Sequence, residues 1–87
     1  MAHVHIHDSE IRRSDSDKAL EILQSFIRHE VDLDQRYLSA SLTADRLAIK
    51  VWLASHRGVY GVPDQYMGMP VIVMYPTYRG FERYWAH

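Results

Sequence analysis

One segment of this sequence repeats its apolar residues with the period of an α-helix, and that single helix limits what the rest of the chain can form. The repeating residues are Leu20, Leu23, Phe26, Ile27 and Val31. Lys18, Glu21, Arg28 and Glu30 are available for the wetter side, as expected of a helix with one buried side. We predict a helix over residues 15–31, with Leu23 and Phe26 in the core.

The segments after this helix alternate between apolar and polar residues, as strands with one buried face do. The alternating apolar residues are Leu38, Ala40 and Leu42 in residues 37–43, and Leu47, Ile49, Val51 and Leu53 in residues 47–53. Residues 43–46 favour a four-residue turn between them, so we predict a β-hairpin. A helix over residues 44–56 is the alternative, but it would be apolar nearly all round, whereas the strand has one apolar face.

Glycine and proline divide the rest of the chain. Residues 55–69 form a predicted long loop, a type of segment that is usually functional or mobile in a small domain. The run Val71–Tyr75 is the most strand-like of the sequence. Residues 76–80 supply turn residues, and residues 81–85 can return as a last strand, with a short C-terminal helix as the alternative.

Residues 2–7 also alternate and predict a first strand, which completes the order β-α-β-β-β-β. The sequence therefore predicts an α+β fold in a single small domain over residues 1–87. Its antiparallel or mixed sheet would have about four to five strands, with one main helix packed across a face.

Composition narrows the function classes. Hydrophobic residues make up 47% and charged residues 24% of the chain, which is typical of a folded domain. The absence of cysteine excludes a disulfide framework, a zinc ribbon and a thiol nucleophile. A formal net charge of −1 is too neutral for a protein that binds nucleic acid chiefly by phosphate neutralisation.

Two features of the sequence favour a protein that does not enter a membrane. The first residues lack the basic start and the long apolar run of a signal peptide. The longest apolar run, Val71–Tyr75, is far too short to span a bilayer. We expect a cytoplasmic protein without a membrane partner.

Alternating histidines form one candidate site. His3, His5 and His7 would lie on one face of the predicted first strand, and neighbouring imidazoles there could hold a zinc-like ion, with Asp8 as an oxygen ligand. A polar strand face produces the same pattern without a metal. His29, His56 and His87 offer no recognisable second half of a site, so metal binding stays the alternative.

Aromatic and arginine residues gather in the C-terminal segment, and we predict the partner-binding surface there. The predicted surface comprises Tyr78, Arg79, Phe81, Arg83, Tyr84 and Trp85, together with Tyr60 and Tyr66 from the long loop. Tyr, Trp and Arg dominate the energetics of protein interfaces because they bury much area at low entropic cost. The same residue types can stack on unpaired bases, and alternate members could instead fill the core.

Catalytic motifs are missing from the sequence. No Ser/His/Asp order, phosphate-binding glycine loop or nucleophile elbow occurs, so we expect a non-enzymatic protein without a cofactor. Small ribosome-dependent mRNA-cleaving toxins use Arg, Tyr and His on a sheet, and Arg79, Arg83, Tyr84 and His87 could imitate that set. Those toxins are normally strongly basic, and this chain is not.

The leading hypothesis is a small protein that binds and inhibits or regulates a macromolecular partner, either a protein or a ribonucleoprotein. Inhibitors encoded by phages and mobile elements, anti-CRISPR proteins included, share its profile of one small domain without a cofactor motif. The alternatives are an RNA-cleaving toxin-like or RNA-binding protein, and a metal-binding module that uses the N-terminal histidines.

Overall fold

The computed structural model describes residues 17–85 of the chain. In chain order its elements are an α-helix over residues 17–26 continued by the π-helical η1 (Ile27–Val31), then β1 (Tyr37–Leu42), β2 (Ile49–Leu53), the 3₁₀-helix η2 (His56–Gly61), β3 (Gln65–Tyr66), β4 (Met69–Thr77) and β5 (Gly80–Arg83). The α+β prediction of one main helix and about five strands is confirmed. The strand predicted for residues 2–7 lies outside the described residues.

The helix packs one side against the sheet, but that side is rotated from the predicted one. Ala19, Ile22 and Phe26 are buried, and this spacing places them on one stripe of the helix. Leu23 is only half-buried at the margin of the core, and Leu20 is exposed. The prediction for Phe26 was right, whereas Leu23 was wrongly assigned to the core. The last turn widens in η1, where the Asp32 N–H donates to the Ile27 carbonyl over 2.8 Å.

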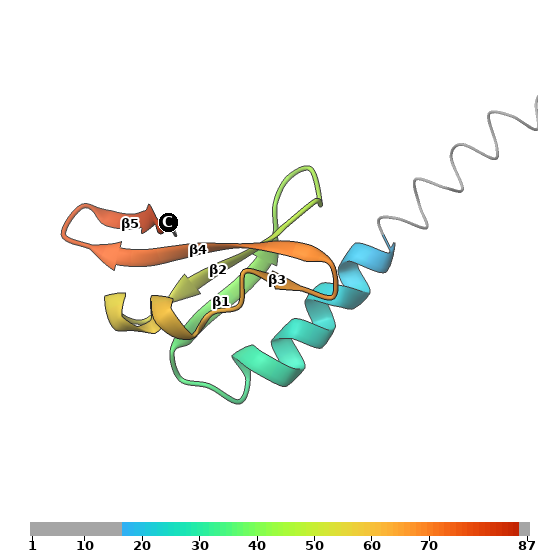
Figure 1. Ribbon diagram of the computed structural model, residues 1–87, viewed down its shortest axis with the longest axis horizontal. Helices are drawn as coiled ribbons and strands as arrows, with labels where there is room; N and C mark the ends of the chain where they lie inside the picture. The colour runs from blue at the N-terminus through green and yellow to red at the C-terminus, as the bar shows by residue number, and fades with distance from the viewer. Residues whose placement is uncertain (1–16, 86–87) are drawn as a thin grey trace, which may run out of the picture.

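The sheet is mixed, with the strand order β1-β2-β4-β3 and with β5 also paired to β4 (Figure 1). β1 and β2 form the predicted antiparallel hairpin, so the alternative helix over residues 44–56 is wrong. β2 and β4 are parallel, and β4 pairs antiparallel with β3 at its start and with β5 at its end. The predicted last strand is therefore confirmed, and the alternative C-terminal helix is wrong.

A bulge in β1 overturns the predicted alternation of its first residues. Tyr37 pairs with Leu53 and Ser39 pairs with Trp52, so Leu38 is an extra residue between the two pairs. Tyr37 is consequently buried, while Leu38 is 60% exposed. Leu47 is exposed as well, because it lies in the turn before β2 rather than in the strand.

The core lies between the helix and one face of the sheet. Its fully buried large side chains are Phe26, Ile49, Val51 and Leu53. Phe26 packs edge to face against Tyr37 and Tyr66, with ring centroids 5.7 and 5.1 Å apart. Such aromatic pairs stabilise beyond the area that they bury.

The segment between β2 and β4 is more ordered than the predicted long loop. It contains η2, which inserts Val59 into the core, and the short strand β3. A two-residue turn at Met67 and Gly68 then leads into β4, and both residues have positive φ, of 49° and 86°. Among the described residues, no helix combines the length and the hydropathy needed to cross a bilayer.

Replacement of Phe26 by Ala should lower the free energy of unfolding by about 3–5 kcal/mol, because it opens a cavity at the centre of the core. Leu23→Ala is the matched control on the same helix, and we expect a clearly smaller loss there since Leu23 is only half-buried. Urea unfolding measures both. Equal losses at the two positions would contradict the helix orientation described above.

Replacement of Met67 by Asn should raise the free energy of unfolding by about 0.5–1 kcal/mol. Asn tolerates positive φ far better than an unbranched apolar residue, and Asn-Gly is the preferred pair for a two-residue turn in which both residues have positive φ. Thermal unfolding of the variant measures the gain. Met67→Val should have the opposite effect, because a β-branched residue at positive φ is strained.

Candidate functional site

The register of the sheet divides its side chains between two faces. Ile49, Val51 and Leu53 of β2 point to the helix, so Lys50 and Trp52 point to the opposite side. Their partners across the sheet follow from the pairs Lys50–Ile72, Trp52–Met74, Met74–Arg83 and Pro76–Phe81. We call this second side the open face. It comprises Ser39 and Ser41 of β1, Lys50 and Trp52 of β2, Ile72, Met74 and Pro76 of β4, and Phe81 and Arg83 of β5.

The covering elements all lie on the other side of the sheet. The helix packs on the face that carries Val51, because Ala19, Ile22 and Phe26 share one core cluster with it. η2 lies on that same side, since Val59 enters the core and His56 packs edge to face on Tyr75 at 4.9 Å. Within residues 17–85, no helix or loop covers the open face.

Aromatic side chains on the open face are paired with cations. The Lys50 ammonium lies 5.5 Å from the centroid of the Trp52 ring. The Arg83 guanidinium lies 3.9 Å from the centroid of the Trp85 ring, and Trp85, two residues beyond the end of β5, extends the open face. Phe81 is 44% and Trp85 62% exposed. The result is a continuous surface of aromatic and aliphatic side chains with two cations in it.

Charge on the open face has one sign. Lys50 and Arg83 are its two charged residues, and none of the strand positions that form it in the described part of the chain carries a carboxylate. Glu82 lies between Phe81 and Arg83 in sequence and therefore points to the opposite side of the sheet. A complementary surface would be apolar and acidic.

The predicted partner-binding residues separate into three places. Phe81, Arg83 and Trp85 belong to the open face. Tyr78 and Arg79 form the tip of the β4–β5 hairpin, where Tyr78 is 91% exposed and the Arg79 guanidinium lies 5.3 Å from its ring. Tyr60 is exposed on η2, away from the open face.

Two of the predicted surface residues pack against the core instead. The Tyr66 ring contacts Phe26, and its hydroxyl shares a 2.8 Å hydrogen bond with Ser25 Oγ of the helix. Tyr84 packs edge to face on Tyr75 with centroids 6.3 Å apart, on the helix side of the sheet. Both tyrosines are half-buried, so the structure places them against the core and not on the open face.

The residues that could imitate an mRNA-cleaving toxin do not converge where the structure describes them. Arg83 lies on the open face, Tyr84 on the opposite face, and Arg79 at the hairpin tip. His87 lies outside the described residues, as do His3, His5 and His7 of the predicted metal site. The residues that the structure describes contain no group of three or more His, Cys, Asp or Glu side chains placed to hold a metal.

Sequence reasoning missed the half of the open face that comes from β2 and β4: Lys50, Trp52, Ile72 and Met74. One signal for it was present. Trp52 interrupts the polar side of an otherwise clean strand pattern, and a Trp at a supposedly solvated position indicates a surface that makes contacts. The run Val71–Tyr75 is apolar at every position, which indicates a central strand with an apolar residue on both faces.

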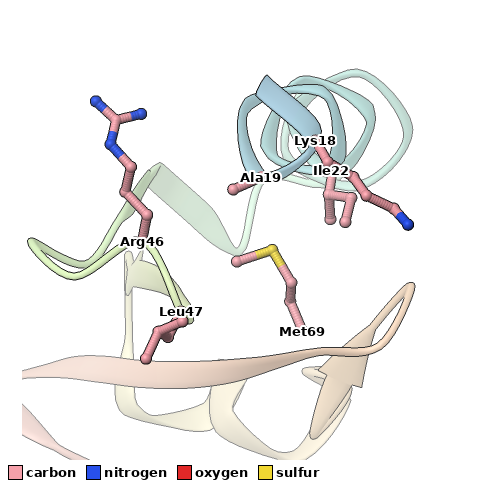
Figure 2. A pocket seen from close by; sticks show the side chains of 6 residues that line it. All are labelled: Lys18, Ala19, Ile22, Arg46, Leu47 and Met69. Atoms are coloured by element: carbon pink, nitrogen blue, oxygen red, sulfur yellow. The ribbon is translucent and has the colours of Figure 1, made fainter. Parts of the chain in front are cut away.

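A small cavity of about 240 Å³ is a second candidate (Figure 2). It lies between the helix, the β1–β2 turn and the start of β4, and is lined by Lys18, Ala19, Ile22, Arg46, Leu47 and Met69. Met69 extends from β4 between the helix and the turn, while the charged ends of Lys18 and Arg46 point away from the cavity. It is smaller than the roughly 300–1,000 Å³ typical of ligand pockets, and its lining is mostly apolar.

The turn beside this cavity is held by its own side chains. The Thr43 hydroxyl donates to Asp45 Oδ1 over 2.6 Å, and the Leu47 N–H donates to the same oxygen over 3.0 Å. These hydrogen bonds, that of Thr43 first, lower the pKa of the Asp45 carboxyl below its ordinary value. Arg46 has a φ of 60° in this turn. The hydrogen bonds of Thr43 and Asp45 account for the turn without a ligand in the cavity.

Comparisons of the chain with protein-family models, with curated proteins and with solved structures found no match.

Tyr84→Ala and Trp85→Ala test the division of the C-terminal segment between core and surface. We expect Tyr84→Ala to lower the free energy of unfolding by about 1–3 kcal/mol, because Tyr84 packs against the core. Trp85→Ala should change it by no more than about 0.5 kcal/mol, because that side chain is exposed. Chemical unfolding of the two variants decides, and a reversed order would contradict the faces assigned here.

Proposed function

We propose that this protein is a non-enzymatic binding domain, and that it inhibits or regulates a partner protein by covering part of that partner's surface with its open face. Small inhibitors from phages and mobile elements act in this way, with one domain and no cofactor. The observation that carries the proposal is the uncovered aromatic and cationic sheet face, with Trp52, Phe81 and Trp85 beside Lys50 and Arg83.

The residue types of the open face support a protein partner. Interfaces are enriched in Trp, Phe, Met and Arg, and the residues that contribute most binding energy are Trp, Tyr and Arg. Trp52 and Met74 are neighbours across β2 and β4, and Arg83 is the neighbour of Met74 on the other side. These three adjacent side chains would form the centre of the interface, with the serines of β1 and the exposed Trp85 at its rim.

Nucleic acid is the less favoured partner. A surface that binds unpaired bases needs several aromatic platforms and enough cations to follow the phosphates. The centre of the open face is aliphatic at Ile72, Met74 and Pro76, and the face carries only two cations among the described residues. The whole chain has a formal net charge of −1, which does not favour a polyanion.

Affinity capture with matched variants tests the proposal. The wild-type protein and the variants Trp52→Ala, Arg83→Ala and Trp85→Ala are each used to capture proteins from a nuclease-treated extract of the source cells. We expect one protein to bind the wild type and to lose at least about 2 kcal/mol of affinity with Arg83→Ala or Trp85→Ala, mainly through faster dissociation. Purified partner and surface plasmon resonance then give the rates.

Two variants away from the open face serve as controls. Tyr60→Ala removes an exposed aromatic residue on η2, and Arg28→Ala removes an exposed cation on the helix. Both should retain the partner. Capture that is unchanged in all open-face variants, or that occurs from an untreated extract but not from the nuclease-treated one, would contradict the proposal.

A further inference from the structure

β5, which contributes to the open face, is an edge strand of the sheet. β5 pairs with β4 on one side only, and none of the described residues pairs with its other side. An edge strand of this kind presents unpaired N–H and C=O groups, which can pair with an added strand. β3 lies along the same edge of β4 as β5, but it pairs only with Met69 and Pro70. It therefore does not cover the free edge of β5.

The phase of the hydrogen bonds identifies the residues that face outward. The two-residue turn at Tyr78 and Arg79 makes Thr77 and Gly80 the first bonded pair of the hairpin. Tyr84 is in the same phase, since its N–H donates to the Val73 carbonyl over 2.8 Å. Gly80, Glu82 and Tyr84 thus direct their backbone groups toward β4. The backbone groups of Phe81 and Arg83 point away from it.

Phe81 and Arg83 therefore have two properties at once. Their side chains lie on the open face, and their backbone groups form the free edge of the sheet. A strand added at this edge would enlarge the open face, with alternate side chains next to Phe81 and Arg83. Since Arg83 and Lys50 are the only charged residues of that face in the described chain, acidic and apolar side chains complement it.

Pairing of β5 with the β5 of a second copy of this chain is unfavourable. Two-fold pairing of β5 with itself centred on Glu82 would place the two Glu82 carboxylates directly opposite each other, and centring on Arg83 would do the same with two guanidinium groups. Centring on Phe81 would place Arg83 opposite Arg79. Like charges directly opposite each other destabilise a strand pair.

We infer that the partner of the proposed function contributes an extended segment that pairs with β5, either antiparallel or parallel. Every second side chain of this segment lies on the open face, and these side chains are acidic or apolar. This inference rests on the proposed function and adds the mode of binding to it. β-strand addition of this kind takes affinity from backbone hydrogen bonds and specificity from alternate side chains.

Peptide selection on the purified protein tests the inference. A display library of random peptides of about eight residues, long enough to pass β5 at roughly 3.3 Å per residue, is selected on the wild type. We expect enrichment of peptides with acidic and apolar residues in every second position. The same library selected on the Arg83→Glu variant should yield basic residues in place of acidic ones, and Arg28→Glu on the helix should leave the selection unchanged.

Backbone pairing is then tested directly with N-methylated versions of a selected peptide. Methylation of every second amide should weaken binding by about tenfold or more in one phase, because it removes the N–H groups that pair with β5. Methylation in the other phase removes amides that point to solvent and should preserve binding. Equal effects of both phases would overturn strand addition.

Other outcomes also overturn the inference. These are no enriched peptide, enrichment without charge or alternation, tighter binding of oligo(U) than of any peptide, or a dimer in sedimentation that peptides do not dissociate. The proposed function fails separately, through the capture experiment. If open-face variants lose a captured protein while no strand-like peptide binds, the binding domain stands and the strand-addition mode does not.

Discussion

The parallel pairing of β2 with β4 is the contact on which the rest of this domain depends. It joins the β1–β2 hairpin to the β4–β5 hairpin, aligns Val51 with Val73 beneath the helix, and fixes Trp52 beside Met74 on the other side. Strands in parallel pairs usually belong to sheets covered on both faces, and they are apolar on both faces for that reason. Here the described residues cover one face. The uncovered apolar residues are thus a consequence of the topology, and a partner would complete the second layer.

Local patterns in the sequence were sufficient for the main helix and for β1, β2, β4 and β5, but not for η2 and β3. The helical period around Phe26, the alternation of Ile49, Val51 and Leu53, and the turn residues around Gly80 are all short-range signals, and the helix and strands that they predict within residues 17–85 are present. The strict alternation failed at Leu38 because a bulge inserts one residue, which depends on how the two strands pair and not on either strand alone. The predicted helix orientation failed at Leu20 and Leu23, since the buried stripe of the helix runs through Ala19, Ile22 and Phe26 instead.

The candidate site was only half accessible to sequence reasoning, since it combines residues from strands that are distant in the chain. A cluster within one segment, such as Phe81, Arg83 and Trp85, can be read directly. That Trp52 and Met74 continue it depends on a parallel register that no local period encodes. The same limit explains Tyr66 and Tyr84. Their residue type suggested an interface, but the position of Phe26 and Tyr75 opposite them decides that they pack inward.

The segment between β2 and β4, described above through η2 and β3, also determines the order in which this protein can fold. Each hairpin closes a short turn and can form on its own within microseconds. The parallel pair can form only after residues 54–68 have been folded back, at the entropic cost of closing that longer loop. The two hairpins should therefore exist before they dock. Until then the apolar residues of β4 are exposed on both sides, and the chain is most vulnerable to aggregation at that stage.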